Sequence, residues 1–228
     1  MKARAFLIGL MMSVSVLGSA QAAATYDAAA DFSSSSNTSS NPWSYGFTTS
    51  LADGYGVVLF DSFRQMGSLS VWWSSTHNVL GAPAAWIDAN AAPEQRFAMH
   101  PGPNAGADSA VLRFTAPTSG TYTVDGRFFS GDFGAMSGTV VLGGLLSNPL
   151  FQIGATTDAA SSAFSFATLT LAQGQTLDFL VGNNGSFFGG STPLSVTITQ
   201  SVSSVPEPTS FALLLAGGVL LVAMRRRQ

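Results

Sequence analysis

Apolar residues in the central part of the chain recur at every second position, and this alternation limits what the chain can fold into. Between positions 194 and 199 they are Leu194, Val196 and Ile198, and the residues between them are Ser or Thr. Successive side chains of a β-strand point to opposite faces of the sheet, so such a segment has one apolar and one polar face. An α-helix would instead need apolar residues three or four positions apart. The segment therefore predicts a strand that is buried on one face.

Four more segments alternate in the same way and are equally short. They are residues 68–73, 111–116, 122–128 and 177–181. Turn-forming residues at 116–120 and 172–175 give connections of hairpin length, and no convincing amphipathic helix separates the strands. We therefore predict an all-β domain, an antiparallel β-sandwich with a jelly-roll-like arrangement. A closed barrel would produce a similar pattern.

The N-terminal residues have the pattern of a secretory signal peptide. A basic start precedes an apolar stretch at 5–17, and Ala20 and Ala22 then give the small-x-small pattern of a cleavage site. We expect cleavage after Ala22, with the next two alanines as near alternatives. Residues 1–22 are therefore left out of the fold.

The C-terminal residues combine a short tripeptide, an uncharged stretch and a basic end. The stretch at 209–224 is short for a hydrocarbon core, which needs roughly 17–25 helical residues, but it predicts one transmembrane helix. The arginines after it should stay in the cytoplasm and leave the rest of the chain outside. An ordinary membrane anchor and a buried core helix are the alternatives. The flanking residues are Pro206, Glu207 and Pro208 before the stretch, and Arg225, Arg226 and Arg227 after it.

This combination resembles the PEP-CTERM sorting signal of exported bacterial proteins. The resemblance implies that exosortase, a membrane enzyme, recognises residues 206–208 and processes the chain near them, while the arginines act as a stop signal. The membrane would hold the chain through its C-terminal helix until then. It also implies an envelope-anchored protein, or one delivered to the extracellular polysaccharide matrix.

The part between the two ends resembles a β-sandwich domain that is common in PEP-CTERM proteins. The loop at 105–108 departs from that pattern, because relatives are usually more compact there. The resemblance implies a fold and a destination but no established catalytic activity. Its motifs are residues 31–33, 41–46, 100–104, 111–117, 120–122, 171–179 and 181–185.

These observations divide the chain into a signal peptide (1–22), a β-sandwich domain (23–200), a short stalk (201–205) and a sorting segment (206–228). The exported part holds all twelve acidic residues but only four basic ones, so its net charge is −8. A domain this acidic, without lysine, has no footprint for nucleic acid. The chain has no cysteine, which excludes disulfides, thiolate metal sites and a cysteine nucleophile.

Four tryptophans in the first half of the chain are the candidate binding residues. Flat aromatic rings near Asn and Asp suit sugars, whose C–H faces stack on them while the hydroxyls bind polar groups. Two of the four, Trp72 and Trp73, are adjacent in the sequence and must point to opposite faces of their strand, so we expect one of the two in the core. Core packing of the whole group is the alternative to glycan binding. The four are Trp43, Trp72, Trp73 and Trp86.

The carboxylates and histidines give no motif with catalytic or metal-binding spacing. Asp31, Asp108 and Asp132 are the candidates for a structural calcium, but loop carboxylates exposed to solvent have the same pattern. We expect no cofactor otherwise. We expect His77 and His100 to be packing or turn residues. The prediction is a non-enzymatic surface or matrix protein; an exopolysaccharide-binding module and a glycan hydrolase are the alternatives.

Overall fold

The structure is a computed structural model, and it describes residues 23–156 and 162–201. The predicted signal peptide with Ala20 and Ala22, the sorting residues 206–208 and 225–227, and the predicted helix at 209–224 lie outside the described residues. Within the described part of the chain, no helix is long and apolar enough to cross a membrane.

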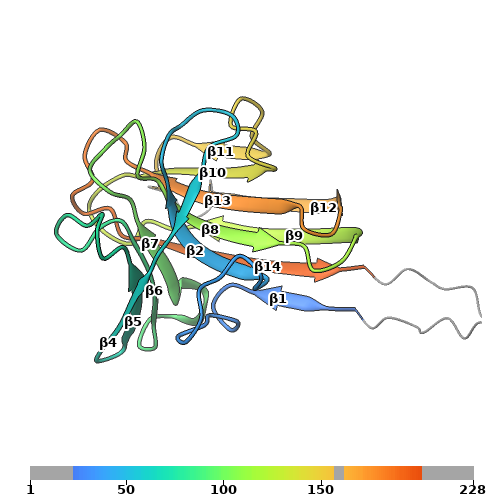
Figure 1. Ribbon diagram of the computed structural model, residues 1–228, viewed down its shortest axis with the longest axis horizontal. Helices are drawn as coiled ribbons and strands as arrows, with labels where there is room; N and C mark the ends of the chain where they lie inside the picture. Colours follow the sequence, from blue (N-terminus) through green and yellow to red (C-terminus); the bar gives the residue numbers. More distant parts are fainter. Residues whose placement is uncertain (1–22, 157–161, 202–228) are drawn as a thin grey trace, which may run out of the picture. The chain divides into compact units, whose positions relative to one another are not determined.

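The described residues form two antiparallel sheets that face each other (Figure 1). The eight-stranded sheet has the order β12 (Ala163–Leu171), β9 (Gly120–Phe128), β14 (Thr192–Gln200), β7 (Phe97–His100), β6 (Ala84–Asp88), β5 (Leu69–Trp73) and β4 (Ser62–Met66), and β1 (Thr25–Asp27) pairs with β14. The six-stranded sheet has the order β11 (Phe151–Ile153), β10 (Ser137–Leu142), β13 (Thr176–Gly182), β8 (Ala110–Thr115), β2 (Trp43–Thr48) and β3 (Val57–Leu59). A short 3₁₀ turn, η1 (Pro93–Gln95), is the only helical element in the described residues.

The predicted antiparallel β-sandwich is confirmed. The five segments with alternating residues correspond to β5, β8, β9, β13 and β14. Both sheets end in unpaired edge strands within the described residues, so the closed-barrel alternative is wrong. From β8 to β14 the chain alternates between the sheets, apart from the adjacent pair β10 and β11, as in a jelly roll.

The two connections of hairpin length join strands of opposite sheets instead of paired neighbours. Residues 116–120 lead from β8 to β9, and residues 172–175 lead from β12 to β13. The flanking strands bury apolar side chains in the same core, where the rings of Phe114 and Tyr122 lie 5.9 Å apart. The connections also pair with each other, because Ala116 N donates to Gln175 O at 3.0 Å and Gly174 N donates to Ala116 O at 2.9 Å.

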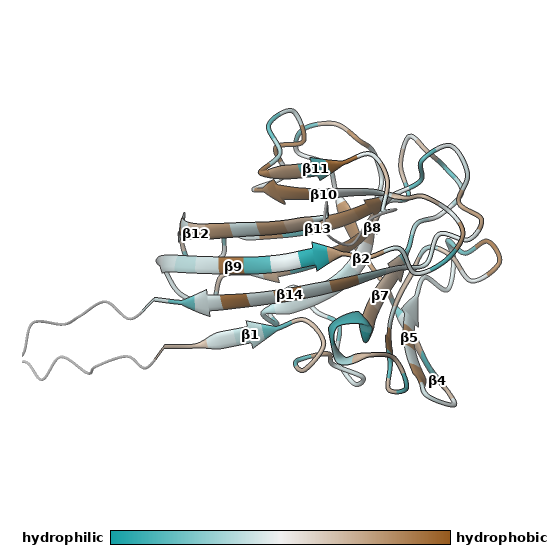
Figure 2. Ribbon diagram, turned by 180° about the vertical axis from the view of Figure 1, so that it is seen from behind, coloured by the Kyte–Doolittle hydropathy of each residue, from teal (hydrophilic) through white to brown (hydrophobic). Residues whose placement is uncertain are grey.

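The core between the sheets is rich in aromatic side chains. Tyr45, Phe97, Phe128 and Phe179 are fully buried in it. The hydropathy of β9 and β14 alternates along their length (Figure 2), because every second side chain faces the core and the others face solvent.

The first and last described strands lie side by side. Thr25 pairs with Thr199, and Gln200 N donates to Ala24 O at 2.8 Å. The chain therefore enters and leaves this domain at one end of the sandwich, and the loops before β6, after β7 and before β14 lie at the other end (Figure 1).

Candidate functional site

Two of the four candidate tryptophans lie together on the outer face of the eight-stranded sheet. Val71 on β5 is directly opposite Arg64 on β4 and Trp86 on β6. Trp73 is two positions after Val71, so its side chain is on the same face and diagonal to Trp86. Both tryptophans are partly exposed, whereas Val71 beneath them is buried. We call Arg64, Val71, Trp73 and Trp86 the tryptophan face.

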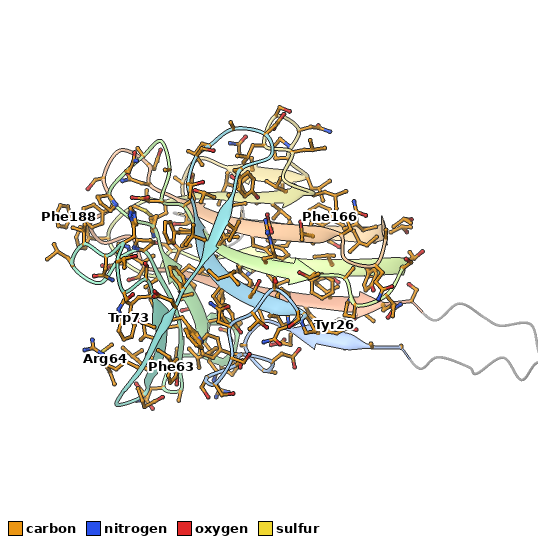
Figure 3. All side chains as sticks on the ribbon, viewed as in Figure 1. Tyr26, Phe63, Arg64, Trp73, Phe166 and Phe188 are labelled. Carbon is orange, nitrogen blue, oxygen red and sulfur yellow. The ribbon has the colours of Figure 1, made fainter. Side chains whose placement is uncertain are left out.

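Arg64 gives this face its charge. Its guanidinium carbon lies 5.3 Å from the centre of the Trp73 ring, within the range of a cation–π contact. Figure 3 shows both side chains at the β4–β5 edge of the sheet. The arrangement combines an apolar, flat surface with the N–H donors of a guanidinium. Such a surface can stack against the C–H face of a sugar ring and donate hydrogen bonds to its hydroxyls.

The other two tryptophans are core residues. Trp43 is 3% exposed, and its ring centre is 5.1 Å from that of Phe114. Trp72 is 7% exposed, and its Nε1 donates to Ser33 O at 2.7 Å. Neither ring presents a flat face to solvent. The adjacent residues Trp72 and Trp73 do point to opposite faces of β5, as the alternation of strand side chains requires.

Each of the three calcium candidates has a hydrogen-bond partner of its own, and the three do not share one. Asp31 Oδ2 accepts from Asp27 N at 2.8 Å, and Asp132 Oδ1 accepts from Phe133 N at 2.8 Å. Asp108 is buried, and its Oδ1 lies 2.8 Å from His77 Nε2. The described residues contain no group of three or more His, Asp or Glu that could hold a metal ion. A structural calcium therefore stays an untested expectation.

The two histidines hold loops in place. The His77 ring stacks on Phe47, with ring centres 4.7 Å apart. His100 Nδ1 donates to Pro101 O at 2.7 Å, because a carbonyl oxygen can only accept, and its Nε2 accepts from Gly190 N at 3.2 Å. Burial lowers the pKa of His100, although the hydrogen bond to Pro101 and, to a smaller extent, the charge of Asp132 act in the opposite direction. The neutral imidazole thus connects the loop after β7 to the loop before β14.

The lowered pKa of His100 predicts that the fold weakens in acid. In the unfolded chain this side chain takes up a proton near its ordinary pKa of 6.5, but in the folded chain it does so only at lower pH. Below pH 6.5 the unfolded state therefore binds more protons than the folded state, so the free energy of unfolding falls as the pH falls. Urea unfolding of the full chain at about pH 7.5 and about pH 5.5 measures this loss. His100→Gln should show a smaller difference between the two pH values, and an unchanged difference would contradict the assignment.

Two features of the outer faces were missed by sequence reasoning. Arg64 carries no motif, although Gly67 between two apolar segments is a hairpin signal that would have placed it opposite Val71. On the six-stranded sheet, Asp178 binds Tyr55 and Arg113. No sequence signal indicates that cluster, because its members are far apart in the chain.

Comparisons with known proteins identify the tail and give only distant likenesses for the domain. The family model of the PEP-CTERM protein-sorting motif matches residues 204–228. No curated protein sequence matches the chain at a significant level. The chain therefore carries the predicted PEP-CTERM sorting motif, which indicates an exported, envelope-associated protein sorted by exosortase.

Among solved structures, the likenesses include family 35 carbohydrate-binding modules at low similarity. The module from an environmental isolate has 17% identity and a TM-score of 0.32, with 70% of this chain and 98% of that chain covered. The module from Clostridium thermocellum has 14% identity and a TM-score of 0.29, with 61% and 98% covered. The Podospora anserina GH26-CBM35 β-(1,4)-mannanase has 17% identity and a TM-score of 0.30; 81% of this chain is covered, and this chain spans 29% of the mannanase. Likenesses this distant say nothing about what this chain binds.

Proposed function

We propose that the exported domain is a non-enzymatic module that binds extracellular polysaccharide through the tryptophan face. The observation that carries the proposal is the diagonal placement of Trp73 and Trp86, partly exposed on one sheet face, with Arg64 over the first ring. Apolar rings that are partly exposed on the outer face of a sheet are suited to contact a partner. Among potential partners, a glycan matches both the flat rings and the adjacent N–H donors.

The destination of the protein supports a glycan partner. The sorting motif at 204–228 belongs to exported proteins, and polysaccharide is the material around an exported matrix protein. The chain leaves the domain after β14, beside β1. Trp73 on β5 belongs to the part of the sheet away from that exit (Figure 3), so the tryptophan face does not include the residues next to the exit.

A binding role fits this face better than hydrolysis does. A glycosidase of the common type needs two carboxyl groups on either side of the bond that it cleaves. The carboxylate closest along β6 is Asp88, two residues after Trp86, and its Oδ1 already accepts from Asn90 N at 3.0 Å. The guanidinium of Arg64 donates hydrogen bonds but does not release a proton at neutral pH, so it cannot act as a general acid. The tryptophan face therefore offers contacts for a sugar chain, and none of its four residues carries a carboxyl group.

Binding of the full chain to exopolysaccharide isolated from its own host tests this function. We expect saturable binding in a depletion assay, and about two- to tenfold weaker binding for Trp73→Ala and for Trp86→Ala, if a stacked sugar contributes about as much as a stacked aromatic pair. Phe188→Ala is the matched control, because Phe188 is also an exposed aromatic residue but lies away from Trp73 (Figure 3).

The assay separates the alternatives. Saturable binding that both tryptophan variants keep in full would place the glycan site elsewhere and overturn the proposal. No saturable binding by the wild type would leave a purely structural matrix protein. Shortening of the polysaccharide during the assay would favour the hydrolase alternative.

A further inference from the structure

A cavity of about 240 Å³ lies on the outer face of the six-stranded sheet, over β10 and β13. In its floor, Thr139 on β10 is directly opposite Gln152 on β11. Ser137, two positions before Thr139 and therefore on the same face of β10, is directly opposite Gly182 on β13. Ser109, which comes directly before β8, also lines the floor. The cavity is separate from the tryptophan face, which belongs to the other sheet.

Three hydroxyl groups of this floor have no hydrogen-bond partner among the described residues. They belong to Ser109, Ser137 and Thr139, of which Ser109 is 3% and Thr139 9% exposed. None of the three oxygens is closed off, in contrast to the unpaired Ser44 Oγ, which is completely buried. Buried hydroxyls are normally bonded, because leaving them unpaired is unfavourable. The floor therefore presents donors and acceptors that the protein itself does not use and that a molecule in the cavity can reach.

Gly182 leaves room for two of these hydroxyls. A Cβ atom at this position would lie 2.5 Å from Ser137 Oγ and 3.3 Å from Ser109 Oγ, so both oxygens converge over the glycine. Gly182 is not one of the glycines with a positive φ, so its backbone conformation does not require glycine. What the missing side chain does is keep this part of the floor open, with two hydroxyls close enough together for one ligand to contact both.

Two loops give the cavity apolar walls that are already fixed. Leu51 lines it from the loop before β3, and Leu146 lines it from the loop after β10. The loops are bonded to each other, because Ser147 donates to Asp53 through its backbone N at 2.7 Å and through its Oγ at 2.6 Å. Leu146 also packs against the buried Leu180 in a small apolar cluster. Walls that are in place before binding reduce the free-energy cost of ordering when a ligand enters.

The lining also determines the chemistry of the ligand. It contains no charged side chain among the described residues, so an ionic ligand would leave its charge unpaired. Hydroxyls of a ligand can donate to and accept from Ser and Thr hydroxyls, and the Gln152 amide adds two donors and an acceptor. The volume is below the range for drug-sized ligands, roughly 300–1,000 Å³, and suits a single ring. A pyranose ring combines hydroxyls at its rim with C–H faces that fit leucine walls.

We propose that this cavity binds one pyranose unit of a neutral glycan. The hydroxyls of the sugar exchange hydrogen bonds with Ser109, Ser137 and Thr139, and its C–H face contacts the leucine walls. The site does not depend on the proposed role of the tryptophan face. It is a second binding site, on the outer face of the other sheet and sized for a single sugar unit.

Amide signals of the cavity floor test the proposal directly. In ¹⁵N-correlated spectra of the full chain, in a detergent without a sugar headgroup, the reporters are the backbone amide of Gly182 and the side-chain amide of Gln152. The probes are D-glucose, D-galactose and D-mannose, and sodium D-glucuronate serves as the anionic counterpart. We expect at least one neutral sugar to shift both signals saturably, and glucuronate to leave them in place.

Two variants remove the site in different ways. Thr139→Val deletes a hydroxyl without a partner in the described residues, so we expect unchanged urea unfolding but about two- to tenfold weaker binding of the neutral sugar. Gly182→Ala places a methyl group where the hydroxyls of Ser137 and Ser109 converge, and should abolish the shift of the Gln152 signal. Thr170→Val is the matched control, because Thr170 is an exposed threonine on β12 of the other sheet.

The outcomes distinguish this site from the tryptophan face. Trp73→Ala should leave the shifts of the Gly182 and Gln152 signals unchanged, even if it abolishes polysaccharide binding. The proposal is overturned if no neutral sugar moves the two signals, in which case water satisfies the hydroxyls. It is also overturned if glucuronate moves them equally, if Thr139→Val binds the sugar as tightly as the wild type, or if the shifts disappear in Trp73→Ala.

Discussion

Replacing Arg113 by Met is expected to lower the free energy of unfolding by about 3–5 kcal/mol, the usual cost of leaving one member of a buried ion pair without its partner. Asp178 is 0% exposed, although it lies on the outer face of the six-stranded sheet. Arg113 Nε donates to its Oδ1 at 2.7 Å, and Arg113 Nη2 donates to its Oδ2 at 2.8 Å. Without Arg113 the carboxylate would be buried with a single donor.

That remaining donor is Tyr55, which covers the carboxylate from above. Its hydroxyl donates to Asp178 Oδ2 at 2.6 Å. Burial, together with the nearby carboxylate, raises the pKa of Tyr55 far above its ordinary value, so the hydroxyl keeps its proton and stays a donor. One neutral hydrogen bond does not replace a bidentate guanidinium. We therefore expect Tyr55→Phe to destabilise the fold much less than Arg113→Met.

Urea unfolding of the full chain measures the effect. The control is Arg127→Met, because Arg127 is exposed and its contact is with the Phe129 ring, at 5.8 Å. We expect its loss to stay below about 1 kcal/mol. The double variant Arg113→Met, Asp178→Leu should recover most of the stability, since replacing both members of a buried pair removes the unpaired charge. An Arg113→Met variant as stable as the Arg127 control would show that the cluster contributes little.

The cluster also explains why the two outer faces differ. The loop that carries Tyr55 lies over the six-stranded sheet and is fixed to the loop after β10, because Gly54 N donates to Gly144 O and Ser147 binds Asp53. The Tyr55 ring and neighbouring apolar residues form a small second core there. Among the described residues, no comparable cluster lies over the tryptophan face.

Strands with an alternating sequence were predictable, including β13, which is buried on both faces. β14 alternates between buried and partly exposed residues along most of its length, and its sequence alternates in the same way. β2 also alternates, because Trp43, Tyr45 and Phe47 belong to the core and small or polar residues stand between them, but this strand was missed although the pattern was present. β10 is mostly buried, and Ser137–Leu142 has no alternation of apolar and polar residues, so its sequence did not indicate a strand.

The candidate site was predictable only in part, because residue type indicates chemistry and register determines position. The adjacent residues Trp72 and Trp73 had to face opposite ways, but only the structure, in which Trp72 lies in the core, shows that Trp73 faces out. Trp43 and Asp31 were suggested for different roles, as a glycan contact and a metal ligand. They line one cavity, because the segment between them folds back on β1. No spacing rule relates such residues.

Replacing Glu207 by Ala in the sorting motif is expected to stop removal of the tail. Glu207 lies in the matched motif, 204–228, which implies processing by an exosortase-type membrane enzyme. Wild-type protein from its native host should then begin near Ala23 and end near Pro208. The variant should keep the sequence to Gln228 and remain in the membrane fraction.

Intact mass of the protein in the envelope and medium fractions distinguishes processing from plain anchoring. Glu94→Ala is the matched control, because Glu94 is an exposed glutamate in η1 and lies outside the motif, so its mass should change only by the substitution. If wild-type protein keeps residues 209–228 in the membrane fraction, the tail is an ordinary anchor and exosortase does not process it. If Glu207→Ala is processed like the wild type, the enzyme recognises the tail without this carboxylate, and the prolines on either side become the next residues to replace.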